Sequence, residues 1–302
     1  MINNCGDAID MTTINDKKKY LVLDLSDYSV SFLYDEPRYG WTDEYKTTKL
    51  VLRYIPKGSF IMGSPENQIG HCADEEQHKV ILTTPFYIGV FEVTQKQYEL
   101  ISGENPSKYK GDMRPVESVS YNMLRGKFKG SKWPRNNEVD SDSFLGKLRA
   151  LSRLEFDLPT EAQWEYACRA GTTTALNSGK ELTSWDECPN MSELGRYAKN
   201  RDDGKGGYGE HTVVGLYKPN AWGLYDMHGN VWEWVLDWIK YYPNETQIDP
   251  KGADNSHARL LRGGGWHYTA AACSSTYRDY DCCYPDDNDN CNGFRLAINI
   301  NI

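Results

Sequence analysis

The sequence predicts one irregular α+β domain made of small antiparallel sheets, few helices and much loop. Three observations lead to this class. The 302 residues include nine Trp and 21 Tyr, an aromatic content typical of folds with little regular structure. Segments rich in β-forming residues are short, and turn residues bound them. The clearest signals for a helix N-terminus precede short helices. A chain of this length can nevertheless bury a substantial core.

Strand-like regions are expected in the first third of the chain. Residues 20–25 and 48–55 are rich in β-formers and are bounded by Asp, Gly and Pro. Residues 55–64 are typical of a strand, a turn and a second strand, and residues 85–94 of a further strand. Residues 128–143 are poor in apolar side chains, so we expect a mobile insertion there.

Two capping boxes mark the starts of helices. Thr94 is followed by Gln97, and Thr160 is followed by Gln163, the residue types that cap a helix N-terminus reciprocally. The second helix should end at Gly171, because glycine readily adopts the left-handed conformation that ends helices. Each of the two capping boxes therefore predicts a short helix with a well-defined first turn.

Charge and hydropathy exclude two classes of protein. The net charge of −9 and the pI near 5.3 argue against a nucleic-acid-binding surface. The chain contains no run of 18 apolar residues, so no transmembrane helix is expected. No apolar stretch precedes Cys5 as in a signal peptide, so the protein is either cytosolic or has had its export segment removed.

The cysteines form no CxxC pair, and their uneven spacing does not favour a disulfide framework. A zinc site built from Cys282, Cys283 and Cys291 is an alternative. It would need a special turn, because adjacent cysteines point in divergent directions on an extended strand. Incidental thiols remain the simpler interpretation. The eight cysteines are Cys5, Cys72, Cys168, Cys188, Cys273, Cys282, Cys283 and Cys291.

Residues 267–292 contain no Lys, Glu, Gln, Met or Trp. These five amino acids are the ones that a codon ending in cytosine cannot encode, and such a codon can encode every residue present. Packing does not impose this rule, because polar surface loops normally contain Lys, Glu and Gln. A bias at the codon level is the better explanation, with an ordinary Cys- and Asp-rich loop as the alternative.

Several motifs, densest around the Trp- and Gly-rich residues 223–234, resemble the formylglycine-generating, sulfatase-modifying family. They are residues 62–64, 92–94, 158–167, 223–234, 262–264 and 293–295, in family order. The resemblance implies a variant of the C-type lectin fold. It also implies a domain over residues 45–302, with residues 1–44 as an N-terminal segment packed on it.

One of the two cysteines that the family's oxidase requires is missing from this sequence, so we expect no oxidase activity. The family's oxidase uses two cysteines, which bind copper and attack the substrate thiol, and their positions here fall on Tyr268 and Cys273. A single thiolate cannot hold Cu(I) as a linear bis-thiolate, so no copper is expected. The alternative is an oxidase or another thiol enzyme that uses Cys273 with His267 or His228.

The family's calcium positions can also be carried over. Asp226, Gly229, Val231 and Glu233 match one site, in which two side chains and two carbonyls would supply hard oxygen ligands. The alternative is that both carboxylates accept bonds from backbone amides. A second family site matches Asn200 but has Gly206 where a carboxylate is expected. A structural calcium ion is therefore expected at most, and no cofactor is required.

Several members that lack the cysteine pair, among them treponeme variable proteins, are diversified by retroelements that miscopy template adenines into the gene. This resemblance implies a non-enzymatic lipoprotein of the cell surface, held to the membrane only by a lipid anchor, that binds an unknown protein or cell-surface ligand. Tyr and Asp side chains suit a basic or polar partner, and we expect them to face solvent. The predicted ligand-binding residues are His267, Tyr268, Thr269, Ala272, Tyr277, Asp279, Tyr280, Asp281, Cys282, Cys283, Tyr284, Asp286, Asp287, Asn288, Asp289, Asn290, Cys291 and Asn292.

Overall fold

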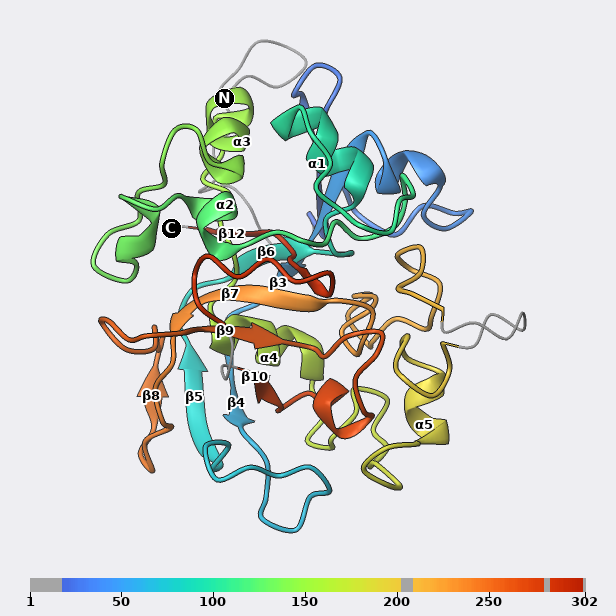
Figure 1. The fold of residues 1–302 in the computed structure, drawn as a ribbon, viewed down its shortest axis with the longest axis vertical. Helices are drawn as coiled ribbons and strands as arrows, with labels where there is room; N and C mark the ends of the chain where they lie inside the picture. The colour runs from blue at the N-terminus through green and yellow to red at the C-terminus, as the bar shows by residue number, and fades with distance from the viewer. Residues whose placement is uncertain (1–17, 202–208, 280–282, 301–302) are drawn as a thin grey trace.

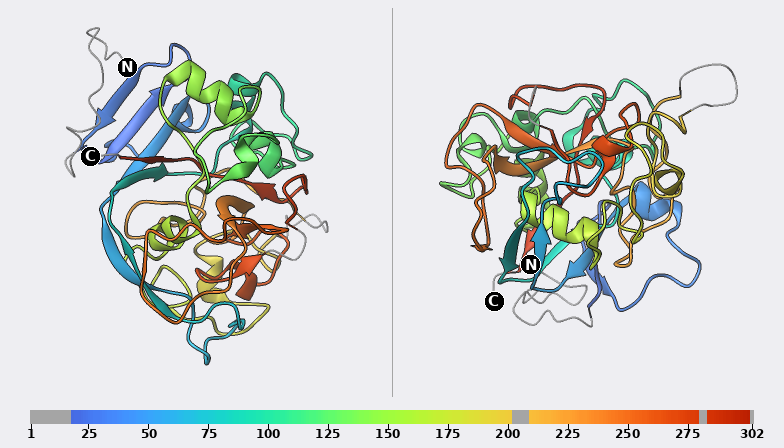
Figure 2. Two further views of the ribbon diagram at one scale, coloured as in Figure 1. Left: turned by 90° about the vertical axis from the view of Figure 1, so that its left-hand side faces the viewer. Right: turned by 90° about the horizontal axis from the view of Figure 1, so that it is seen from below.

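The computed structural model describes residues 18–201, 209–279 and 283–300. It contains three small sheets, short helices and much loop, which confirms the predicted class (Figure 1). Helices α1 (Gln95–Ser102) and α3 (Phe144–Ser152) lie at the same end of the molecule as the N-terminal strands (Figures 1 and 2). Among the described residues, no helix combines the length and the apolar character that crossing a membrane requires.

The largest sheet has five strands in the order β12-β6-β3-β1-β2, and each neighbouring pair is antiparallel. Its register pairs Leu21 with Leu52 and Leu23 with Leu50, and all four side chains are buried in the main core. The N-terminal segment therefore contributes two strands to the sheet itself. The strands are β1 (Tyr20–Asp24), β2 (Val30–Leu33), β3 (Lys49–Ile55), β6 (Phe86–Gly89) and β12 (Ala297–Asn299).

A second sheet has the strand order β10-β9-β7-β11 and includes parts of residues 267–292. Its central strand β7 (Trp232–Trp238) is buried along its whole length. Strand β9 (Arg259–Arg262) pairs with β7 and with β10 (Arg278–Asp279), whereas β11 (Asn292–Gly293) runs parallel to β7. The codon-biased segment, residues 267–292, thus supplies β10 and the first of the two residues of β11, one strand at each edge of this sheet.

The third sheet consists of β4 (Gly58–Met62), β5 (His78–Leu82) and β8 (Gln247–Ile248). Strands β4 and β5 are antiparallel, and β8 pairs with β5 in parallel. The predicted strand, turn and strand after residue 48 is confirmed, because β3 ends at Ile55 and β4 begins at Gly58. The expected sheets were antiparallel, but β8 pairs with β5 and β11 pairs with β7 in the parallel direction.

The helices begin where the capping boxes predict. Both boxes are complete, so helix α1 begins after Thr94 and α4 (Glu161–Arg169) after Thr160. Helix α4 ends with Ala170 in the left-handed conformation, one residue before the predicted Gly171. The remaining helical segments are α2 (Tyr121–Arg125), α5 (Pro189–Ser192) and the 3-10 turns Asp43–Lys46, Gly130–Lys132 and Ala271–Cys273.

The expectation of a mobile insertion at residues 128–143 is wrong. The Asp140 carboxylate accepts hydrogen bonds from the backbone N–H groups of Phe128 and Lys129, at 2.8 and 2.6 Å. Trp133 is buried in the main core. Polar composition suggested a solvated loop, but a single buried aspartate and one tryptophan hold it against the domain.

Candidate functional site

The site is built around a glycine turn that follows strand β9. Gly264 has a φ of +77°, and a Cβ atom there would lie 2.4 Å from the Cys273 Sγ atom and 2.7 Å from its Cα atom. Only glycine allows the turn to approach Cys273 so closely. The turn therefore presses directly on the buried part of the codon-biased segment.

Residues 270–276 form the floor of the site. All seven side chains are buried, and Ala270, Ala271 and Cys273 pack in one hydrophobic cluster with residues of the 175–197 region. Arg262 fixes the backbone below them, because its guanidinium donates to the carbonyls of Ser275 and Thr276 at 2.9 and 2.6 Å. Small side chains are needed here because a close-packed interior does not tolerate added volume.

Arg278 anchors the end of the floor. Its Nε atom donates to Glu161 Oε1 at 2.7 Å, and its Nη1 atom donates to Asp74 Oδ2 at 3.1 Å. All three side chains are buried. The floor is therefore fixed both by packing and by buried ion pairs to α4 and to the loop between β4 and β5.

Residues 284–290 form the exposed face of the site. Tyr284 is 54% exposed, and Asp286, Asn288 and Asp289 are also exposed. The N–H of Asn122 donates to the Pro285 carbonyl at 2.9 Å, and the N–H of Ser118 donates to the Asp289 carbonyl at 3.1 Å. Both bonds involve only the backbone of the face, so they survive a change of its side chains.

One side chain of the face is also held by the scaffold. The Asn122 amide donates to Asp286 Oδ1 at 2.6 Å, and Lys127 Nζ lies 3.5 Å from Asp286 Oδ2. The hydrogen bond from Asn122 and, secondarily, the charge of Lys127 lower the pKa of Asp286. This carboxyl is therefore ionised at neutral pH.

Aromatic side chains line the boundary between floor and face. Tyr268 and Tyr277 are half-buried and contact the Trp232 ring, with centroid distances of 5.1 and 6.0 Å. The half-buried His267 ring lies 4.5 Å from that of Trp266. These rings are partly exposed and pack on the tryptophans of the scaffold. Thr269, Asp279, Asp287 and Asn290 are likewise half-buried.

The expectation that the predicted ligand-binding side chains face solvent is wrong for Ala272, Cys283, Cys291 and Asn292. All four are buried. The backbone is drawn into the sheet there, because Trp232 donates to the Cys291 carbonyl and Arg259 donates to the Cys283 carbonyl. Tyr280, Asp281 and Cys282 lie outside the described residues, and with Cys282 so does one member of the zinc alternative.

The buried thiol of Cys273 is poorly suited to nucleophilic chemistry. Burial raises its pKa to about 12, so the thiol is protonated at neutral pH. The nearby His228 is equally buried, and burial lowers its pKa to about 4. Its Nε2 accepts from the Asn177 N–H, so Nδ1 carries the proton and donates to the Cys273 carbonyl. Both ring nitrogens are therefore committed to backbone groups.

The calcium positions fit an ion only in part. The Asp226 Oδ1 atom is buried without a hydrogen-bond partner among the described residues, as a ligand oxygen would be. Glu233, however, accepts from Arg295 at both oxygens, at 2.6 Å each, and from Trp164 Nε1 at 2.7 Å. Arg295 thus supplies the counter-charge, and Glu233 would have to release it before binding calcium.

Neither of the two calcium sites carried over from the family has a complete set of free ligand oxygens among the described residues. Asp226 Oδ2 accepts from the Gly215 N–H at 2.6 Å, as the alternative of backbone bonds expects. The Asn200 side-chain oxygen already accepts from the Tyr197 N–H at 2.8 Å. Gly206 lies outside the described residues. Calcium binding at Asp226, Gly229, Val231 and Glu233 therefore stays a prediction.

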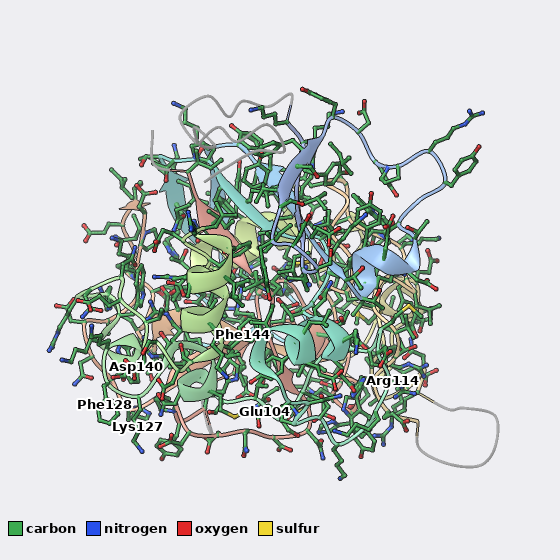
Figure 3. The ribbon with its side chains drawn as sticks, turned by 90° about the horizontal axis from the view of Figure 1, so that it is seen from above. Glu104, Arg114, Lys127, Phe128, Asp140 and Phe144 are labelled. Atoms are coloured by element: carbon green, nitrogen blue, oxygen red, sulfur yellow. The ribbon has the colours of Figure 1, made fainter. Side chains whose placement is uncertain are left out.

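A groove beside the face was not foreseen from the sequence. It is a cavity of about 250 Å³ whose lining includes Asn122, Lys127, Phe128, Asp140 and Phe144. Lys127, Phe128 and Asp140 lie together at one edge of the upper side of the molecule (Figure 3). The signal that could have found it is Phe128, a large apolar residue in a polar loop that is 76% exposed.

The fold and the site define an irregular α+β domain of the formylglycine-generating, C-type-lectin-like class. The chain belongs to the family of the sulfatase-modifying factor enzyme 1-like domain, and the model of this family matches residues 42–300. This confirms the family resemblance deduced from the motifs.

Relatives and solved structures agree with this assignment. The formylglycine-generating enzyme of Bos taurus is 26% identical over 288 residues, which cover 83% of this chain and 74% of that protein. The chaperone protein LppX of Paenibacillus barcinonensis is 31% identical over 217 residues, covering 62% and 71%. Treponema denticola variable protein 1 has a similar structure, with a TM-score of 0.67 and 24% identity, covering 83% and 95%. PvdO from Pseudomonas aeruginosa gives a TM-score of 0.64 and 24% identity, covering 82% and 94%.

Proposed function

We propose that this protein is a non-enzymatic, surface-displayed binding protein whose ligand site lies in residues 267–292 and is diversified by a retroelement. One observation carries the proposal. The exposed part of the codon-biased segment, residues 284–290, is attached to the scaffold at Pro285 and Asp289 through backbone hydrogen bonds. A site attached in this way keeps its shape when its side chains change, as a diversified loop on a rigid frame requires.

The chemistry of the face indicates the partner. Tyr284 offers a large, rigid contact surface, and Asp286 and Asp289 are exposed carboxylates beside it. Tyrosine with Asp and Asn combines contact area with adaptable hydrogen bonding, as in antibody loops. The acidic character favours a basic or polar protein partner through electrostatic complementarity.

The similarity to Treponema denticola variable protein 1 is consistent with this role. The rival is an oxidase like the formylglycine-generating enzymes, which would use Cys273. The raised pKa of its buried thiol and the presence of Tyr268 at the second cysteine position argue against that activity. Adding copper and a cysteine-containing sulfatase peptide tests the rival directly, because turnover of the peptide would eliminate the binding proposal.

The DNA beside the gene tests the diversification. We expect a near-identical, adenine-rich copy of the codons for residues 267–292 next to a reverse transcriptase gene. A neighbourhood without either would contradict the retroelement, and would leave the ordinary loop as the explanation. Labelling of intact cells with an antibody tests surface display, because an intracellular protein would stay unlabelled until the cells are opened.

A further inference from the structure

The loop between β4 and β5, at the lower end of the molecule in Figure 1, gathers three metal-ligating residue types. The N–H of Glu75 donates to the Cys72 carbonyl at 2.9 Å and closes a turn. This turn brings a ligand atom from each of Cys72, Asp74 and Glu75 within 4.8 Å of the others. Asp74 and Glu75 are buried, and Cys72 is half-buried.

Glu75 is a buried carboxyl group that forms no ion pair with any described residue. It is 1% exposed, and its Oε1 atom has no hydrogen-bond partner among the described residues. Its Oε2 atom accepts from the Ser64 hydroxyl at 2.8 Å, and the Thr276 hydroxyl also interacts with this carboxyl group. An uncompensated carboxylate in the interior is costly unless a proton or a cation neutralises it.

The surrounding arginines are already engaged by other carboxylates. Arg262 pairs with Glu165 at Oε2, and Arg169 pairs with the same group at Oε1, at 2.9 Å. Arg278 pairs with Glu161 at 2.7 Å and with Asp74 at 3.1 Å. Within the part of the chain that the structure describes, none of these guanidinium groups lies within ion-pair distance of Glu75. Glu75 is therefore the carboxyl group of this cluster that no guanidinium pairs with.

We propose that Cys72, Asp74 and Glu75 bind a zinc ion. Zinc takes thiolate and carboxylate ligands at about 2.0–2.3 Å, so its ligand atoms lie roughly 3–4 Å apart. The three ligand atoms here already lie within 4.8 Å of one another. A thiolate in the set favours zinc over calcium or magnesium. Asp74 gives one oxygen to Arg278 and has the other for the ion, and water completes the tetrahedron.

A hydrogen-bonded chain behind the ligands orients them. His71 Nδ1 lies 2.8 Å from the Ser64 hydroxyl, which in turn donates to Glu75. Such outer contacts fix the direction of a metal-binding carboxylate. On this basis Ser64 and His71 are positioning residues.

The bound ion would stiffen the floor of the site. The Gln68 amide donates to the Thr276 hydroxyl at 3.0 Å, and Asp74 holds Arg278. A Cβ atom at Gly70 would lie 2.9 Å from the Cβ atom of Ala271, so this loop packs directly under residues 271–278. The site is independent of whether residues 284–290 bind a ligand.

Metal titration tests the proposal. After removal of metal with a chelator, we expect zinc alone to bind at one site per chain by calorimetry. Cobalt alone should produce a thiolate-to-metal absorption band in the near ultraviolet. Cys72→Ser should abolish that band, and Glu75→Gln should weaken zinc binding at least tenfold. Glu76→Gln is the matched control, because it removes the same charge from the next, exposed residue and should change nothing.

Several results would overturn the proposal. Zinc binding that is equal in Cys72→Ser and the unchanged protein, or absent altogether, would do so. Loss of binding in Cys283→Ser but not in Cys72→Ser would move the metal to the second cysteine cluster. Circular dichroism and thermal unfolding of the metal-free variants must match the metal-free parent, so that a loss of binding cannot reflect misfolding.

Discussion

The floor (residues 270–276) and the face (residues 284–290) belong to one codon-biased segment but differ in how they are held. The floor is fixed by its side chains, which are small, buried and packed under the Gly264 turn. The face is fixed mainly by its backbone, through bonds from Ser118 and Asn122. The comparison shows that one stretch of sequence can combine strict packing with freedom of side-chain choice.

Removing the anchor of the floor should have the largest effect. Arg278→Leu leaves Glu161 and Asp74 buried without their guanidinium, and breaking a buried ion pair costs about 3–5 kcal/mol. Urea denaturation should show this loss of unfolding free energy. A variant as stable as the parent would mean that the network contributes nothing to the fold. Arg278→Lys, which keeps the charge, should lose less.

The glycine turn should be the next most sensitive point. Gly264→Ala combines a left-handed backbone with a Cβ atom 2.4 Å from Cys273 Sγ, so overpacking adds about 1–3 kcal/mol to the backbone cost. Gly40→Ala is the matched control, because Gly40 has a similar φ of +75° and no described atom would lie within 4 Å of its Cβ. It should cost only about 1–2 kcal/mol. Equal losses in thermal unfolding would remove the claim of close packing at the floor.

The scaffold and the face should respond to pH with opposite signs. Burial raises the pKa of Asp237, on β7, to about 7, so the folded state favours its protonated form. The stability of the parent relative to Asp237→Asn should therefore be highest below pH 4 and fall as the pH rises to about 7. The lowered pKa of the exposed Asp286 works the other way. Its contribution is present above pH 4 and disappears in acid.

The two pH effects differ in size as well as in sign. The shift at Asp237 corresponds to a few kcal/mol, on the order of 1.4 kcal/mol per pKa unit. Asp286 is exposed to solvent, so Asp286→Asn should change stability by about 0.5 kcal/mol or less. Denaturant unfolding of both variants between pH 3 and 8 measures the difference. Parallel pH curves for the two variants would contradict it.

Changes confined to the face should have the smallest effect. Tyr284, Asn288 and Asp289 are exposed, so replacing all three with Ala should leave the unfolding free energy within about 1 kcal/mol of the parent. Thermal denaturation checks this. A loss of several kcal/mol would show that these side chains support the fold, and the face would no longer differ from the floor.

The sequence predicted those elements of the fold that depend on interactions between residues close together in the chain. The capping boxes at Thr94 and Thr160 fixed the helix starts to the residue, because the partners lie three positions apart. Strands β1, β3 and β4 were equally visible, whereas β2 was not predicted. The pairing of β10 and β11 with the central strands was not, because it joins distant segments and only two residues make each strand.

The site was predicted in outline but not in its burial. Codon bias located the segment, but it did not predict that residues 270–276 are buried. It could not reveal that Cys283 and Cys291 turn inward, because this depends on backbone bonds to Arg259 and Trp232. The same holds for Glu75, whose lack of an ion pair becomes visible only when the arginines around it are placed.

The most direct measurement is a comparison of two displayed libraries. In one, codons of random first and second base ending in cytosine replace positions 284, 286, 288 and 289; in the other, they replace positions 271, 273, 275 and 276. After sorting for protease-resistant folded protein and sequencing, we expect near-complete amino-acid diversity in the first library and recovery of small residues alone in the second. Equal restriction in both libraries would contradict this expectation.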